Sequence, residues 1–138
     1  MDFQKIFYNR YQVLEEIGEG GLGKVFLVLD SWTQEKLALK LLHPNLVTTS
    51  NLKSFQQEFK LLQALKHPGL VRVYDFLVTP EKEVGYSMEF VPGKPLLENG
   101  KSLELELFYE LGVQICQILD FIHTQGIIHC DLKPENFL

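Results

Sequence analysis

A glycine-rich turn near the N-terminus constrains the fold of this chain more than any other feature. Residues 18–23 read Gly-Glu-Gly-Gly-Leu-Gly, and the apolar residues 24–29 that follow have the pattern of a β-strand. A dinucleotide-binding fingerprint would need a helix directly after its glycines, so a Rossmann site is disfavoured. Two interpretations of the motif alone remain open. It is an ordinary hairpin turn, or it is a loop whose backbone amides approach phosphate oxygens.

The first two thirds of the chain predict an antiparallel sheet with one helix. Strand-like runs separated by turn signals occur at 11–17, 24–30, 36–42, 70–77 and 84–90. The helical pattern lies at 51–66, where Ser50 can cap its start and the sequence His-Pro-Gly ends it. Short connections between consecutive strands favour a meander. We therefore expect an α+β fold in which a five-stranded antiparallel sheet packs with one helix.

The last third of the chain has a different character. A linker opens at 91–93, and residues 103–125 predict one long helix that is capped near Ser102 and stopped by Gly126. Apolar residues cover most of the circumference of this helix, which is typical of a helix that is buried on several sides. The chain then ends within an apolar run. We expect further sequence that covers the helix and that this chain lacks.

Composition narrows the class of protein without identifying it. The net charge is −5 and the basic residues form no cluster, so nucleic-acid binding has no electrostatic support. No apolar run reaches the length of about 18 residues that a membrane-spanning helix needs. The two cysteines, Cys116 and Cys130, indicate neither a disulfide framework nor a metal site. The expected location is cytoplasmic.

Two charged residues in apolar surroundings predict a contact between the sheet and the helix. Lys40 lies in an apolar strand, where by itself it could be an edge lysine that points to water. Glu58 lies on the same helical face as Phe55 and Leu62, and a carboxylate in an apolar stripe is costly unless it pairs with a cation. Lys40 is the natural partner of Glu58. A strand lysine held in this way is well placed to bind phosphate oxygens.

The segment 129–136, His-Cys-Asp-Leu-Lys-Pro-Glu-Asn, is the most specific in the chain. Asp131 can accept or orient a hydroxyl proton, Lys133 can neutralise a moving phosphoryl group, and the side-chain oxygen of Asn136 suits Mg²⁺. The alternative is a polar loop without a catalytic role.

Taken in order, these features resemble the eukaryotic-type Ser/Thr protein kinase family over residues 11–138. The glycine-rich loop, strand lysine, helix glutamate, hinge and catalytic loop all occur at suitable separations. The form Asp-Leu-Lys-Pro-Glu-Asn resembles Ser/Thr kinases rather than tyrosine kinases. The resemblance divides the chain into an N-terminal extension (1–10), a kinase N-lobe (11–91), and the hinge linker, long helix and catalytic loop of a truncated C-lobe (92–138).

The resemblance implies an ATP-binding set in the N-lobe. Glycines would lie over the phosphates, and a lysine paired with a glutamate would hold the α- and β-phosphates. Apolar side chains would wall the adenine, and the backbone of two hinge residues would hydrogen-bond its edge. The glycines are Gly18, Gly20 and Gly23, and the lysine–glutamate pair is Lys40 with Glu58. The adenine walls are Ile17, Val25, Ala38 and the gatekeeper Met88, and the two hinge residues are Glu89 and Val91.

The resemblance also assigns the catalytic loop. Asp131 would be the catalytic aspartate, Lys133 the γ-phosphate contact and Asn136 a Mg²⁺ ligand. The expected activity of the parent protein is phosphoryl transfer from Mg-ATP to a Ser or Thr hydroxyl of a protein substrate. No Asp-Phe-Gly motif follows Asn136 in this sequence, so residues 1–138 alone are expected to be inactive.

Two positions depart from the family pattern. Leu22 replaces the aromatic residue common at the tip of the glycine-rich loop, which is expected to soften this lid over the nucleotide. Cys130 replaces the arginine that usually precedes the catalytic aspartate and pairs with a phosphorylated activation loop. Cysteine cannot form that charge-assisted pair. The hypothesis is that the parent protein is not switched on through this arginine pocket.

Two other functions compete with a catalytic kinase. One is a pseudokinase-like module that binds nucleotide and acts as a sensor or scaffold. The other is a small-molecule phosphotransferase of related fold, whose catalytic loop more often lacks the Lys-Pro-Glu-Asn continuation. The joint presence of Lys40, Glu58, Asp131, Lys133 and Asn136 favours the catalytic kinase, because a scaffold need not retain all five.

Overall fold

A computed structural model of the chain describes residues 6–79, 82–93, 104–128 and 132. The chain divides into two compact units, residues 1–66 with 71–90, and residues 67–70 with 91–138. The sheet and helix α1 belong to the first unit, and helix α2 belongs to the second.

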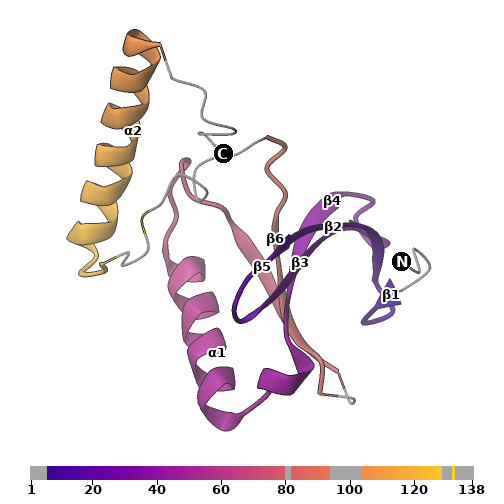
Figure 1. Cartoon of the computed structure of the whole chain (residues 1–138). Coiled ribbons are helices and arrows are strands. Elements are labelled where there is room, and N and C mark those ends of the chain that lie inside the picture. Colours follow the sequence, from indigo (N-terminus) through magenta and orange to yellow (C-terminus); the bar gives the residue numbers. More distant parts are fainter. Residues whose placement is uncertain (1–5, 80–81, 94–103, 129–131, 133–138) are drawn as a thin grey trace. The chain divides into compact units, whose positions relative to one another are not determined.

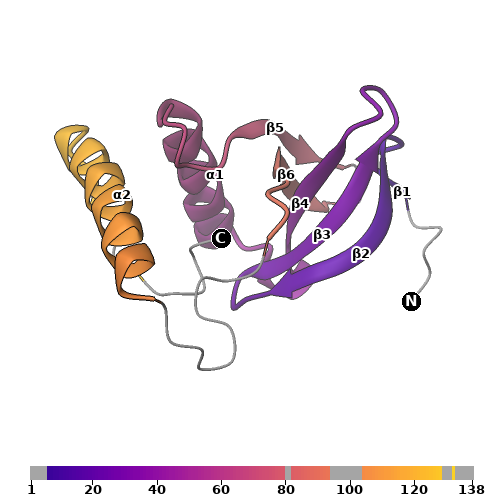
Figure 2. The ribbon, with the colours of Figure 1, turned by 90° about the horizontal axis from the view of Figure 1, so that it is seen from above.

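The first unit is built on one antiparallel sheet of six strands, which curls beside α1 (Figures 1 and 2). The spatial order of the strands is β1-β2-β3-β4-β6-β5, so the first four form a meander and the β5–β6 hairpin joins β4 through β6. The strands are β1 (Ile6–Phe7), β2 (Tyr11–Glu19), β3 (Gly23–Asp30), β4 (Lys36–Leu42), β5 (Val73–Val78) and β6 (Val84–Glu89). The predicted α+β fold with an antiparallel sheet and one helix is confirmed.

One strand of the sheet was not predicted. The two-residue strand β1 pairs with the start of β2 through a tight turn in which Tyr8 and Asn9 have positive φ angles of 54° and 52°. Positive φ is unusual for residues other than glycine, although asparagine adopts it more readily than most. A single Asn after a tyrosine is a weak turn signal, and no turn was predicted from it. The hydroxyl of Tyr8 donates to the Glu83 carbonyl at 3.2 Å, which holds the turn against the β5–β6 hairpin.

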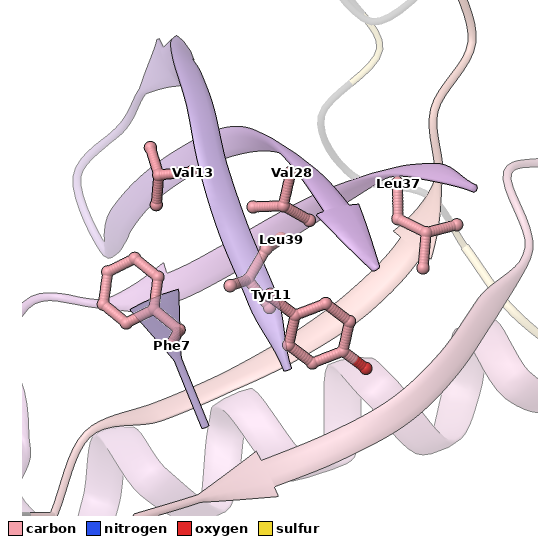
Figure 3. Packing of buried hydrophobic residues seen from close by; sticks show 6 residues of the cluster. All are labelled: Phe7, Tyr11, Val13, Val28, Leu37 and Leu39. Atoms are coloured by element: carbon pink, nitrogen blue, oxygen red, sulfur yellow. The ribbon is translucent and has the colours of Figure 1, made fainter. Parts of the chain in front are cut away.

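Alternation along β4 assigns the two faces of the sheet. Leu37 and Leu39 belong to a buried cluster with residues of β1, β2 and β3, whose side chains converge in Figure 3. Successive residues of a strand point to opposite faces. Ala38, Lys40 and Leu42 therefore point to the other face, where Leu42 packs in the cluster that contains α1. The first cluster consists of Phe7, Tyr11, Val13, Val28, Leu37 and Leu39.

Helix α1 (Thr49–Ala64) docks on the sheet through two buried aromatic side chains. Phe55 and Phe59 lie four positions apart and both contact Tyr86, with ring centroids at 5.1 and 5.7 Å. Thr48 caps the helix by accepting a hydrogen bond from the Asn51 amide at 3.2 Å. The predicted cap at Ser50 is wrong, because the helix begins two residues earlier than its apolar pattern does. A 3₁₀ turn, η1 (Pro44–Leu46), precedes the helix.

An ion-pair network on Arg10 ties together three parts of the sheet. The guanidinium of Arg10 donates to both carboxylate oxygens of Asp30, at 2.8 and 2.6 Å, and to Asp75 at 2.9 Å. It also stacks on the rings of Trp32 and Tyr11, at 4.3 and 4.8 Å. The β1–β2 turn, the end of β3 and strand β5 are thereby joined. The hydrogen bonds from Arg10 lower the pKa of Asp30 below its ordinary value.

The second unit contains α2 (Leu105–Thr124), which falls within the predicted range 103–125. Its predicted cap, Ser102, lies outside the described residues, and Glu104 occupies the cap position. Gly126 has a φ of 74°, the conformation typical of a glycine that ends a helix. Phe121 contacts His67, with ring centroids 5.0 Å apart. Within the part of the chain that the structure describes, neither helix is long and apolar enough to cross a membrane.

Candidate active site

The register of the sheet gathers the predicted nucleotide-binding residues on one face. Gly18 lies opposite Val25, and Val25 lies opposite Lys40. In the next row, Ala38 lies opposite Met88. Residues directly opposite each other in an antiparallel ladder share a face. The two rows therefore lie on the α1 face of the sheet, as the alternation along β4 requires.

Lys40 and Glu58 meet on this face. The Lys40 Nζ lies 2.6 Å from the Glu58 Oε1, and the two side chains retain 23% and 34% of their exposure. Exposed ion pairs contribute about 0–1 kcal/mol to stability, so this pair adds little to the fold. An ammonium carries three donors, and its partial exposure leaves it accessible to an anionic ligand. Packing of Phe55 on the sheet, one helical turn before Glu58, directs the carboxylate toward β4.

A third residue of this cluster was missed by the sequence analysis. The hydroxyl of Tyr86 donates to the same Glu58 Oε1 at 2.7 Å. Tyr86 lies directly opposite Lys40 in the β4–β6 ladder. Burial, reinforced by the charge of Glu58, raises the pKa of Tyr86 far above its ordinary value. In the sequence, Tyr86 has only the pattern of an aromatic residue in a strand. The pairing of β6 with β4, which are not consecutive strands, brings it to Lys40.

The three glycines of the loop differ in how far the fold requires them. A Cβ atom on Gly23 would lie 1.9 Å from the Leu41 carbonyl oxygen, so the pairing of β3 with β4 requires glycine there. A Cβ atom on Gly18 would make only an ordinary contact with Val25 at 3.8 Å, and one on Gly20 would meet nothing within 4 Å. Neither Gly18 nor Gly20 has a positive φ. The fold therefore accounts for Gly23 but not for Gly18 or Gly20.

Charged residues border the glycine-rich loop. The Nζ of Lys24 lies 3.0 Å from Glu16 Oε1 and 3.7 Å from Glu19 Oε1. The hydrogen bond to Glu16 raises the pKa of Lys24. The backbone amide of His43 donates to the Leu22 carbonyl at 3.0 Å, which connects the tip of the loop to the end of β4.

The other predicted contacts of the adenine lie at the ends of strands. Ile17 stands at a bulge between Glu16 and Gly18 and is 42% exposed. The amide of Glu89 donates to the Arg72 carbonyl at 2.8 Å, so its N–H is engaged within the sheet unit. Val91 follows the end of β6 and is partly buried. The predicted adenine contacts of these residues stay predictions.

The predicted catalytic-loop residues Asp131, Lys133 and Asn136 lie outside the described residues, as does Cys130. Their roles stay predictions. Among residues 6–79, 82–93, 104–128 and 132, no group of three or more His, Cys, Asp or Glu side chains could hold a metal ion.

Comparison with known proteins places this geometry in a family. A profile described as "Protein kinase domain" matches residues 11–138. The chain belongs to the protein kinase family. The antiparallel sheet with α1 is thus the N-lobe part of a kinase fold, and α2 is its long helix. The roles of Lys40 and Glu58 stay predictions.

Curated relatives are described as Ser/Thr kinases. The chain is 35% identical to "Serine/threonine-protein kinase PknD" of Chlamydia pneumoniae over 145 aligned positions, covering 94% of this chain and 16% of the relative. It is 32% identical to the protein of the same description from Chlamydia caviae, with 94% and 16% covered. The chain therefore spans about a sixth of the length of these relatives.

A solved structure has the same fold. The kinase domain of Mycobacterium tuberculosis PknI, crystallised as a cysteine-to-alanine mutant, superposes with a TM-score of 0.77 at 23% sequence identity. The match covers 99% of this chain and 57% of that chain.

Proposed function

We propose that the intact protein that carries this chain is a protein Ser/Thr kinase that uses Mg-ATP. The observation that carries the proposal is the Lys40–Glu58 ion pair, which lies in the same cross-strand row as Gly18 and Val25. Membership of the kinase family and the names of the curated relatives support the reaction class.

The residues present fit an anionic phosphate chain. The fold itself does not require glycine at Gly18 or Gly20, and glycine lets ligand oxygens approach the backbone closely. The ammonium of Lys40 is partly exposed on the same face. When bound, ATP supplies the phosphoryl group and Mg²⁺ neutralises part of its charge.

The chain's own residues would position the two substrates and neutralise the charge of the phosphates. Lys40 would hold phosphate oxygens, and Glu58 would hold Lys40 in place. Asp131 would orient the Ser or Thr hydroxyl of the protein substrate and accept its proton, while Lys133 would contact the γ-phosphate. Asn136 is the proposed Mg²⁺ ligand. Because Cys130 cannot pair with a phosphate, activity is proposed not to depend on activation-loop phosphorylation.

The 138 residues by themselves are proposed to be inactive. They correspond to 57% of the solved kinase domain that they match, and phosphoryl transfer needs the positioning that a whole domain supplies. The cytoplasmic location also stays a proposal.

The test is phosphoryl transfer from γ-labelled Mg-ATP to a protein substrate by the intact protein. Transfer to Ser or Thr is expected, and Lys40→Met should lower kcat/KM by at least about 100-fold, the effect of removing one electrostatic contact to a transition state. Lys36→Met, an exposed lysine at the start of the same strand, is the matched control and should leave kcat/KM unchanged. Mg-ATP binding without any transfer would instead favour the nucleotide-binding pseudokinase-like module.

A further inference from the structure

Glu58 is held from two sides by groups on two different strands. Lys40 of β4 lies 2.6 Å from its Oε1, and the hydroxyl of Tyr86 on β6 lies 2.7 Å from the same atom. The Nζ of Lys40 also lies 5.6 Å from the centre of the Tyr86 ring. Because Lys40 and Tyr86 are directly opposite each other in the ladder, both donors reach the helix from one point of the sheet.

The Tyr86 side chain does more than fill space. Only 2% of the residue is exposed, and its ring packs on Phe55 and Phe59 of α1. A buried phenol that lacks a partner would be costly, and in this chain its partner is the carboxylate that pairs with the lysine. Burial raises the pKa of the phenol, so the hydroxyl stays protonated and remains a donor. Hydrogen bonds to ionised carboxylates are stronger than those between neutral groups.

We propose that Tyr86 is a positioning residue that holds Glu58 in its lysine-bound orientation. Lys40 and Glu58 are only partly buried, so water competes for each of them. The buried hydroxyl gives the carboxylate an anchor that does not depend on Lys40. Glu58 therefore stays in place when Lys40 turns toward a phosphate oxygen. This proposal rests on the proposed kinase function, because it assigns Tyr86 to the reaction through Lys40.

Removing the hydroxyl alone tests the proposal. In the intact protein, Tyr86→Phe keeps the ring and should lower kcat/KM for phosphoryl transfer by about 10-fold to 150-fold, the range for a hydrogen bond to a charged group. Tyr11→Phe is the matched control. Tyr11 is also fully buried and its hydroxyl contacts a carboxylate, Asp75 at 3.3 Å, but it lies in the cluster on the other face of the sheet. It should change kcat/KM by less than about twofold.

A double-mutant cycle separates positioning from packing. If Tyr86 acts through Glu58, Tyr86→Phe should have almost no further effect in a Glu58→Ala background. An equal loss of kcat/KM in both backgrounds would overturn the proposal. So would an equal loss in Tyr86→Phe and Tyr11→Phe, since each removes one buried hydroxyl.

A spectroscopic readout keeps this test independent of kinase activity. In ¹H NMR spectra of the intact protein, the Tyr86 hydroxyl proton should be protected from exchange and should disappear in Glu58→Ala but persist in Lys40→Met. Persistence in Glu58→Ala would refute the anchor. If wild-type protein binds Mg-ATP but transfers no phosphoryl group, the kinase proposal fails. The anchor is then judged by this signal and by ATP affinity.

Discussion

The molecule contains two ion-paired regions that differ in construction. Arg10 contacts both oxygens of Asp30 and one of Asp75, and the Asp30 side chain has no exposure. Lys40 meets one oxygen of Glu58, and both side chains remain partly exposed. The guanidinium of Arg10 has several donors committed to protein carboxylates, whereas the ammonium of Lys40 remains accessible to a ligand.

The difference distinguishes a charge that stabilises the fold from one that is accessible for the proposed reaction. A bidentate pair with a buried carboxylate is costly to break, because the remaining charge is left without compensation. A partly exposed single contact is cheap to break, because water replaces the lost partner. Stability should therefore depend on the Arg10 network, and phosphate binding should depend on Lys40.

The largest effect on stability is expected from Asp30→Asn. It leaves the mostly buried guanidinium of Arg10 with one carboxylate partner, Asp75, in place of two. It should lower the free energy of opening of β3 by about 3 kcal/mol, at the low end for breaking a buried pair. Native-state hydrogen exchange of the β3 amides in the intact protein measures this. Lys40→Met is the comparison, because it breaks the partly exposed Lys40–Glu58 pair and leaves the Tyr86 hydroxyl its partner. It should cost less than about 1 kcal/mol. Equal losses in the two variants would abolish the distinction.

The glycine-rich loop contains the same two kinds of residue: the fold requires glycine at Gly23 but not at Gly20. Gly23→Ala places a Cβ against the Leu41 carbonyl oxygen and should destabilise the β3–β4 pairing by about 1–3 kcal/mol. Gly20→Ala has room and should leave stability within about 0.5 kcal/mol, while it weakens Mg-ATP binding. Thermal unfolding and ATP titration of both variants separate the two effects. A stable Gly23→Ala protein would show that the close approach of the strands is not required.

The smallest effect on stability is expected at low pH, through protonation of Asp30. The pKa of Asp30 is lower in the folded protein than in the unfolded chain, so its contribution to stability is fully present above the ordinary aspartate pKa of about 4. That contribution is lost as the pH falls through the lowered folded value. Denaturation at a series of pH values should give a steeper acid loss for wild type than for Asp30→Asn. Parallel curves would mean that Asp30 is not held by Arg10 as the structure has it.

The parts of this molecule that follow simple periodicity could be predicted from the sequence. The β-strand runs and the apolar stripe of α1 indicated the sheet and the helix. The isolated carboxylate in that stripe indicated a partner, and the structure places Glu58 against Lys40. These features depend on residues that are close in the sequence or on one strand facing one helix.

The parts that were missed depend on pairing between distant segments. Tyr86 reaches Glu58 only because β6 inserts between β4 and β5. Arg10, Asp30 and Asp75 each look like a polar residue near the end of a strand, and only the curl of the sheet brings them together. Strand β1 is too short for any alternation and depends on the backbone conformation of Tyr8 and Asn9.

The central proposal is that Lys40 binds the phosphates of ATP, whereas Asp30 stabilises the fold. Isothermal titration of the intact protein with Mg-ATP, beside its thermal unfolding, tests both parts in the same two variants. Lys40→Met should weaken ATP binding by at least about tenfold, the loss of one charged contact, while its unfolding midpoint stays near that of wild type. Asp30→Asn should show the reverse. ATP affinity that is unchanged in Lys40→Met would contradict the account.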